Sequence, residues 1–245
     1  MQVLDSHAHS GHTLSFKILE ALWRDAGITG GALIPPVEEI YDRYDWGFID
    51  SPFYQDSRVK VHAYLKSLRS DQIFTYWFVW NDFALPEAGF SGVKWHRHSN
   101  EPKYKYDSEA CYQFIEQICA QRLPVMIEDE FHYTQELLKR INGRTAVIIP
   151  HFGGLNGGYE RLKRAGVFDN PQVYVDTALA SPYELMDFAR DYGVDRILFG
   201  SDYPFGDPGS ERYKVEQVFT TGEELEKVLA LNLLKLMERS GKKEA

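Results

Sequence analysis

The sequence predicts an α/β protein that folds as a single-domain (β/α)₈ TIM barrel, on the basis of three observations. The chain has 245 residues, close to the roughly 250 typical of one such barrel. Short apolar runs alternate with amphipathic stretches, a pattern typical of a parallel sheet with helical connections. Eight apolar runs can be counted, as many as a closed barrel requires. Residues 1–245 are therefore expected to form one domain.

The expected strands are short runs of aliphatic and aromatic residues bounded by polar residues or glycine. In chain order they cover residues 2–8, 28–34, 73–80, 91–97, 123–128, 145–151, 172–178 and 195–201. The carboxyl ends of parallel strands meet at one face of a barrel, and catalytic residues of TIM barrels lie at that face. Polar residues that follow these runs are therefore the candidates for function.

Amphipathic periodicity predicts helices between and after these strands, over residues 14–25, 108–121, 135–141, 159–165, 182–192 and 223–238. We expect Asp107 to cap the second of them and Ser181 to cap the fifth, whose first residue is proline. One long connection, residues 35–57, is rich in aromatic residues, aspartate and proline. Long loops in compact domains are often lids or binding loops, although a plain insertion remains an alternative.

Composition excludes several classes of partner. The net charge of −9 argues against a nucleic-acid partner, which usually requires a basic face. No apolar run approaches the ~20 residues of a membrane helix, and the N-terminus resembles a strand rather than a secretory signal. Cys111 and Cys119 fall in one expected helix, eight residues apart, and are interpreted as buried thiols. A cytoplasmic protein is expected, and a homo-oligomer is compatible with the sequence.

The first expected strand ends in Asp5-Ser6-His7-Ala8-His9. Side chains alternate along a strand, so His7 and His9 point to the same side and could share one metal ion. Two histidines with this spacing are a weak signal by themselves. Their position at the end of the first strand of an expected barrel makes the interpretation much more specific.

Two further polar residues follow buried runs near the C-terminus. His151 follows the sixth expected strand, where it is either a site residue or a structural histidine that satisfies backbone groups. Asp202 follows the eighth strand, where a carboxylate is either a helix cap or a metal ligand and base. Together with His7 and His9, these residues favour the functional interpretation.

The fourth and fifth strands carry buried charge. Glu128 ends the fifth strand, and a carboxylate there is costly to bury unless it binds a metal or pairs with Lys94 or Arg97 of the neighbouring strand. Lys94 and His96 share one face of the fourth strand, and Arg97 lies at its end. We expect Lys94, His96 and Arg97 to bind an anionic substrate, with a solvated loop as the alternative for the lysines that follow.

These segments together resemble the amidohydrolase superfamily, specifically its amidohydrolase-related branch, also called amidohydrolase 2. The matching segments are DSHAH, GVKWH, LPVMIE, IIPHFGG, VYVDTA, RILFGSDYPF and the closing ALNLLKLM. The resemblance covers nearly the whole chain, and its most specific element is FGSDYP in order after the paired histidines and HFGG. It implies a (β/α)₈ barrel with one or two divalent metals.

The resemblance also implies roles for individual residues. His7 and His9 match the metal ligands of strand one, and Asp202 matches the aspartate that contacts the metal and handles a water proton. His151 matches a histidine that is a ligand in binuclear members and an acid or base in many mononuclear ones. This chain departs from the pattern at Glu128, where the family usually has histidine. Lys94 stands where some members carry a carbamylated lysine that bridges two metals.

The sequence therefore predicts a metal-dependent hydrolase acting on a small, anionic amide, lactone or ester. The expected metal ligands are His7, His9, Glu128 and Asp202. Zinc is the metal expected first, with manganese or iron as alternatives, and His151 with Asp202 would act as general base and then acid. One alternative is a nonoxidative decarboxylase of a small aromatic carboxylic acid, and another is a non-catalytic binding protein whose metal site has decayed. Motifs for dinucleotide, P-loop or serine-hydrolase sites are absent from the sequence.

Overall fold

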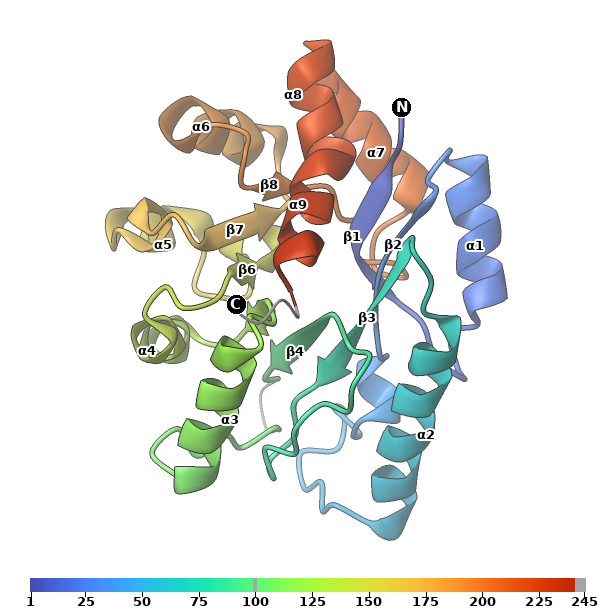
Figure 1. Ribbon diagram of the computed structural model, residues 1–245, viewed down its shortest axis with the longest axis vertical. Helices are drawn as coiled ribbons and strands as arrows, with labels where there is room; N and C mark the ends of the chain where they lie inside the picture. The colour runs from blue at the N-terminus through green and yellow to red at the C-terminus, as the bar shows by residue number, and fades with distance from the viewer. Residues whose placement is uncertain (99–100, 241–245) are drawn as a thin grey trace.

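The computed structural model describes residues 1–98 and 101–240, and within them eight parallel strands form a nearly closed barrel (Figure 1). Each strand pairs with the next in chain order, as predicted. The strands are β1 (Leu4–His9), β2 (Gly30–Ile34), β3 (Ile73–Phe78), β4 (Gly92–His96), β5 (Val125–Glu128), β6 (Val147–Ile149), β7 (Val173–Asp176) and β8 (Ile197–Leu198).

The first and last strands meet through a small number of hydrogen bonds. The Ser6 amide donates to the Phe199 carbonyl at 2.7 Å, and the His9 amide donates to the Tyr203 carbonyl at 2.9 Å. Asp5 reinforces this seam, because its buried carboxylate accepts hydrogen bonds from the Ser201 amide and hydroxyl. The residues at the ends of β1 and β8 are thereby brought together.

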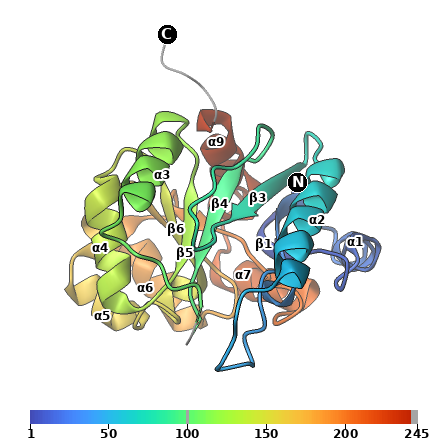
Figure 2. The same ribbon diagram turned by 90° about the horizontal axis from the view of Figure 1, so that it is seen from below.

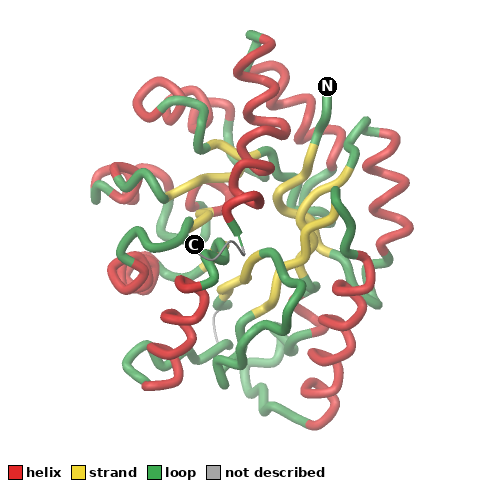
Figure 3. Tube along the Cα trace, viewed as in Figure 1, coloured by secondary structure: helices red, strands yellow, loops and turns green. Residues whose placement is uncertain are grey.

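Helices surround the strands, as the separate colours of Figure 3 show. They are α1 (Phe16–Asp25), α2 (Pro52–Leu68), α3 (Glu109–Ala120), α4 (Phe131–Ile141), α5 (Tyr159–Arg164), α6 (Pro182–Tyr192), α7 (Pro208–Val218), α8 (Gly222–Glu226) and α9 (Asn232–Arg239). None of these helices is long and apolar enough to cross a membrane. The connection between β3 and β4, residues 79–91, is described throughout and contains no helix.

The two ends of the barrel differ. Leu233, Leu236 and Met237 of α9 pack against barrel residues such as Leu4 and Tyr174 and cover the amino-terminal end of the strands. Figure 2 shows α9 at one end of the molecule and the segment that precedes α2 at the opposite end. The carboxyl ends of the strands therefore remain available for a site.

Several predicted boundaries were wrong, each for a local reason. Ser108, rather than Asp107, caps α3, because the Ser108 hydroxyl accepts a hydrogen bond from the Cys111 amide. The connection predicted as residues 35–57 is shorter, because α2 begins at Pro52. Charged residues interrupt the apolar face of α2, so the apolar pattern of the sequence does not predict this helix. The expected closing helix is divided by a π-helical turn, Lys227–Leu231. Ser181 caps α6 through a capping box, as predicted.

Candidate metal and active site

The paired histidines of β1 point to the same side and meet one carboxylate. His7 and His9 are both buried, with ring centroids 5.5 Å apart. Asp202 Oδ1 lies 3.3 Å from His7 Nε2 and 3.2 Å from His9 Nε2. The structure thus brings together three predicted metal ligands that are far apart in the sequence.

The protein occupies the other nitrogen of each histidine ring. His7 Nδ1 lies 3.0 Å from Asp176 Oδ2, and His9 Nδ1 lies 3.0 Å from the Pro35 carbonyl oxygen. His151 Nδ1 lies 3.1 Å from the Ala178 carbonyl oxygen. Because these partners accept hydrogen bonds, neutral rings would carry their proton on Nδ1 and leave the Nε2 lone pair for a metal or a reacting proton.

Left-handed backbone conformations position two of the site residues. The φ angles are 54° at His151, 50° at Phe152 and 53° at Asp202. Such angles are uncommon for residues other than glycine and cluster at functional sites. The Asp176 carboxylate holds the turn at His151, because its Oδ1 accepts a hydrogen bond from the His151 amide at 2.9 Å.

Asp176 is a site residue that the sequence analysis did not identify as functional. It ends β7, is fully buried, and contacts both the His7 ring and the His151 backbone. Its place at the end of the buried run VYVD resembles that of Glu128 after VMI. The same argument about the cost of burying a carboxylate could therefore have identified it.

Lys94 and Glu128 form a buried ion pair between β4 and β5. Lys94 Nζ makes a close contact with Glu128 Oε1 and lies 3.2 Å from His7 Nε2. The other oxygen of Glu128 lies 2.6 Å from His96 Nδ1. The structure thus shows the ion pair with Lys94, one of the two alternatives that the sequence left open for Glu128, and it also places Glu128 beside His7 and His151.

The buried charges shift one another's pKa values. Burial would raise the pKa of Glu128, but the charges of Lys94 and His96 and contacts with His151 hold it well below its usual range. Burial, assisted by the Lys94 charge, lowers the pKa of His7 well below its usual range. Glu128 is therefore ionised at neutral pH and His7 is neutral, the forms in which both can bind a metal.

His151 shifts in the opposite direction. Burial lowers its pKa, but this is outweighed by its contact with Glu128 and by the negative charges of Glu128, Asp176 and Asp202, which raise the pKa to about 9. His151 Nε2 lies 3.7 Å from an oxygen of Glu128 and 3.7 Å from an oxygen of Asp202. The ring therefore carries a proton at neutral pH and faces both carboxylates.

Among the described residues, two groups of side chains at the mouth could hold a cation, and both include His7. One consists of His7, His9 and Asp202, and the other of His7, Glu128 and His151; in each, the ligand atoms lie within 4.8 Å of one another. Imidazole nitrogens with carboxylate oxygens suit zinc, and also manganese or iron. The donor set therefore fits the metal that the sequence predicts.

A pocket of about 460 Å³ opens above these groups at the mouth of the barrel. His9, His96, Glu128, His151 and Asp202 line it on the barrel side. The other lining residues are Val37, Gly154, Leu155, Leu179 and Phe205, which are apolar, and Arg43, His98 and Glu184. The pocket thus combines polar groups at its base with an apolar wall, as is usual for sites that bind small molecules.

Two residues predicted to bind substrate are not among those that line this pocket. Lys94 is fully buried beside Glu128. The guanidinium of Arg97 lies 2.9 Å from Asp129 and stacks 3.9 Å from the centre of the Tyr133 ring. The cation that does line the pocket is Arg43, from the connection before α2, which the sequence analysis did not single out.

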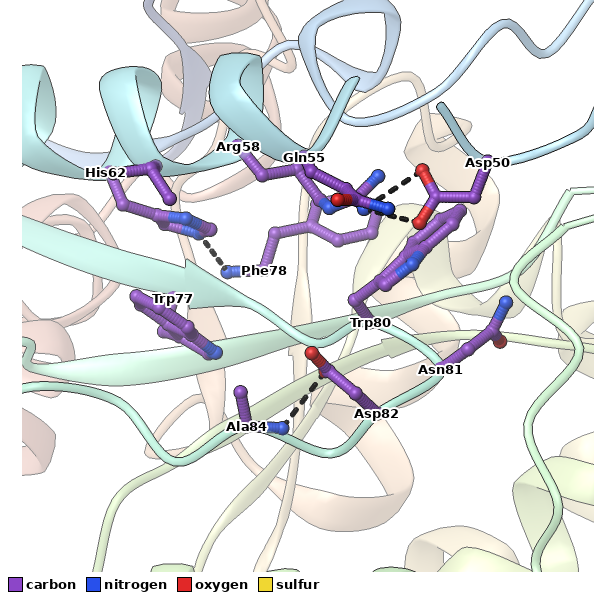
Figure 4. A pocket seen from close by; sticks show the side chains of 11 residues that line it. Asp50, Gln55, Arg58, His62, Trp77, Phe78, Trp80, Asn81, Asp82 and Ala84 are labelled. Carbon is purple, nitrogen blue, oxygen red and sulfur yellow. Dashed lines mark hydrogen bonds and ion pairs between the residues drawn. The ribbon is translucent and has the colours of Figure 1, made fainter. Parts of the chain in front are cut away.

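A larger cavity, about 710 Å³, lies outside the barrel between α2 and the connection that follows β3 (Figure 4). Its charged groups and its histidine have partners within the protein. Asp50 and Arg58 form a two-pronged ion pair, and His62 Nε2 accepts a hydrogen bond from the Phe78 amide at 2.9 Å. None of the predicted site residues lines this cavity, so the mouth pocket is the candidate active site.

Comparison with known proteins gives one family match and several similar folds. A sequence model described as amidohydrolase matches residues 81–236. No curated protein sequence matches the chain significantly. The fold is similar to a structure described as a putative 2-pyrone-4,6-dicarboxylic acid hydrolase from Pseudomonas putida, with a TM-score of 0.69 and 18% identity over 97% of this chain and 98% of that one.

Other similar structures are described as decarboxylases. One is 2,6-dihydroxybenzoate decarboxylase in complex with 2,6-dihydroxybenzoate, with a TM-score of 0.69 and 15% identity over 97% of this chain and 99% of that one. Another is 5-carboxyvanillate decarboxylase from Sphingomonas paucimobilis, with a TM-score of 0.73 and 10% identity over the same shares. At these identities the structural likeness concerns the fold alone, whereas the sequence model covers well over half of the chain. The family match, the barrel and the grouped ligands together lead to one conclusion: the chain belongs to the amidohydrolase family.

Proposed function

We propose that this protein is a metal-dependent hydrolase that acts on a small anionic amide, lactone or ester. The observation that carries the proposal is the convergence of His7, His9 and Asp202, with both Nδ1 atoms held by the protein. When bound, a divalent metal supplies Lewis acidity, which lowers the pKa of water from about 16 toward about 7. We propose zinc first, with manganese or iron as alternatives.

Within this proposal, the chain's residues have distinct tasks. His7, His9 and Asp202 bind the metal, and Asp176 fixes the His7 ring. His151 moves the proton at its Nε2, toward or from Asp202 and the leaving group. Because its pKa is raised to about 9 in the metal-free protein, His151 begins as a proton donor there. Glu128, the fourth predicted ligand, has one oxygen beside Lys94 and the other beside His96, so we assign it as their counter-ion.

Arg43 supports an anionic substrate. Its Nη2 contacts Glu38 at 2.7 Å and the Tyr44 hydroxyl at 3.1 Å, whereas its buried Nε has no hydrogen-bond partner among the described residues. Arg43 shares the pocket with His96 and His98. We propose that these cationic or hydrogen-bonding groups bind the substrate's anionic group. We also propose that the connection before α2, predicted as residues 35–57 and ending at residue 51 in the structure, serves as a substrate loop through Val37 and Arg43.

A nonoxidative decarboxylase is the second candidate, favoured by the apolar wall of the pocket. Leu155, Leu179 and Phe205 offer a surface on which an aromatic ring could pack, opposite the base that holds Asp202 and His151. Two of the similar structures are described as decarboxylases of aromatic acids. In this reading, Arg43 would bind the carboxylate that stays on the product.

One experiment separates the candidates. The purified protein is stripped with a chelator, reloaded with zinc, manganese or iron, and incubated with two panels, one of lactones, esters and amides that carry a carboxylate and one of hydroxybenzoate-type acids. Metal-dependent release of the ring-opened or cleaved acid supports the hydrolase, and metal-dependent release of carbon dioxide supports the decarboxylase. Turnover that persists after metal removal would overturn the metal-dependent proposal. Failure to retain any metal, without turnover, would favour a non-catalytic binding protein.

We also propose a cytoplasmic location and leave the chain's self-association to measurement. The two buried thiols, Cys111 and Cys119, carry no disulfide and suit a reducing compartment. Fractionation of cells tests the location, and light scattering of the purified protein tests for a homo-oligomer.

A further inference from the structure

The two candidate cation positions at the mouth are adjacent and unequal. His7 belongs to both groups, so its Nε2 faces the His9 and Asp202 side and also the Glu128 and His151 side. On the first side, His7 Nε2 lies 3.3 Å from Asp202 Oδ1 and no lysine or arginine of the described chain is recorded in contact with that oxygen. On the second side, a protein cation already contacts the carboxylate, Glu128.

That cation is Lys94. Its Nζ closely contacts Glu128 Oε1 and lies 3.2 Å from His7 Nε2, which are two of the three ligand atoms of the second group. It also lies 3.5 Å from Met126 Sδ. Lys94 is fully buried, with no exposed surface at all. Its position is therefore set by close packing within the barrel and by the Glu128 carboxylate.

We propose that the Lys94 ammonium is a built-in cation that occupies the Glu128 side of the site and limits the protein to one metal ion, held by His7, His9 and Asp202. The proposal rests on the metal binding of the proposed function and adds the number and place of the metal. Its physical reason is simple. A divalent ion among His7, Glu128 and His151 would lie beside a buried positive charge that has no solvent to move into, so the two cations exclude each other.

The same reasoning accounts for the glutamate at the end of β5. A neutral histidine at position 128 would leave the buried Lys94 charge without a counter-ion, whereas Glu128 neutralises it and also reaches His96 at 2.6 Å. Glu128, which stands where the family usually has histidine, is therefore explained by the buried Lys94 that it neutralises. The alternative is carbamylation, in which a neutral Lys94 amine adds carbon dioxide, forms an N–C bond and releases a proton, and then becomes a metal ligand.

The test counts metal ions in wild-type protein and in Lys94→Met, which keeps the length of the side chain but removes its charge. Both are stripped, dialysed against excess zinc or manganese, desalted and measured by mass spectrometry of the metal. We expect one equivalent per chain in the wild type and two in Lys94→Met. In the manganese form, magnetic coupling between two ions would show that the second ion is adjacent. Arg43→Met is the matched control, since it removes a cation from the mouth outside both groups and should keep one equivalent.

Several outcomes would overturn the inference and leave metal binding intact. These are two equivalents in the wild type, an intact mass increased by one carbon dioxide, or a folded Lys94→Met that still binds one. If Lys94→Met does not fold, two variants in the wild-type background decide. His9→Gln should lose the single metal and His151→Ala should keep it, and the reverse pattern places the ion on the Glu128 side and overturns the inference. Absence of metal from every protein would instead overturn the proposed metal dependence itself.

Discussion

Buried histidines occur in two regions of this protein, and their surroundings differ in a way that separates function from structure. At the mouth, the Nδ1 atoms of His7, His9 and His151 each lie within hydrogen-bond distance of an oxygen acceptor of the protein, and their Nε2 atoms face carboxylates. In the cavity beside α2, His62 Nε2 accepts a hydrogen bond from the Phe78 amide, and the His62 ring stacks 3.9 Å from the Trp77 ring (Figure 4). At the mouth, the Nε2 atoms face the charged groups of Asp202, Glu128 and Lys94, whereas the histidine of the cavity uses its Nε2 to satisfy a backbone amide.

The charges of the two regions differ in the same way. Asp50 and Arg58 beside α2 neutralise each other, and Arg58 also covers the Trp80 ring. At the mouth, Glu128, Asp176 and Asp202 contact His7, His9, His96, His151 and Lys94, and the pKa values of the three carboxyl groups are shifted in both directions. The larger cavity is therefore the weaker candidate for an active site, because its charged groups Asp50 and Arg58 are already paired with each other.

The largest effect is expected when the proton-transfer group of the mouth is removed. His151→Ala should lower kcat roughly a hundred- to ten-thousand-fold, the usual contribution of a positioned acid or base. Metal content should remain near the wild-type value, because the proposed ligands are untouched. Steady-state kinetics and metal analysis of the same preparation check both. Loss of the metal in this variant would show that His151 is itself a metal ligand, as proposed for His9.

We expect His62 to affect how the stability of the fold depends on pH, and not to affect turnover. Burial lowers the pKa of His62 to about 4, against 6.5 in the unfolded chain. The unfolded state therefore binds the proton first as pH falls, so His62 stabilises the fold fully above pH 6.5, and this contribution declines toward pH 4. The loss is about 3 kcal/mol at most. Urea unfolding of wild type and His62→Gln, whose amide oxygen can still accept from Phe78, should differ in slope over that interval. Parallel curves would show that His62 does not titrate in this way.

Asp176 has a structural role at the mouth, because its carboxylate holds the His7 ring and the His151 backbone in place. Asp176→Asn should weaken metal affinity roughly ten- to a hundred-fold, as is typical when the partner of a ligating histidine is changed. Competition with a chelating dye measures the change. Asp187→Asn is the control, since Asp187 is equally a buried carboxylate but bonds to Tyr159 and Lys163 on the outer helices. Equal losses in both variants would point to general destabilisation.

The smallest expected effect compares one arginine from each region. Arg43→Gln should raise KM for an anionic substrate about ten-fold, or about 1.4 kcal/mol, with kcat nearly unchanged. Arg58→Gln should leave KM unchanged, because Arg58 faces the outer cavity and pairs with Asp50. Kinetics with a substrate identified by the panels provide the measurement. A KM that rises equally in both variants would contradict the assignment of Arg43 to the substrate.

Much of this protein follows from the sequence by itself. Short apolar runs at eight places predicted the strands, and their alternation with amphipathic stretches predicted a parallel barrel with one catalytic end. His7 and His9 were identifiable because strand geometry puts alternate residues on one side. Asp202 was identifiable because it follows a strand, and the barrel brings it within 3.3 Å of both histidines.

Tertiary structure decided the remaining features, because they depend on which side chains meet across strands. Lys94, His96 and Arg97 are neighbours in sequence, yet Lys94 enters the barrel and Arg97 packs on Tyr133. Arg43 reaches the mouth only because its connection folds over the barrel end. Contacts between residues distant in the chain fix the partner of each buried charge, and a charge's partner determines whether it binds a ligand, balances another charge or supports the fold.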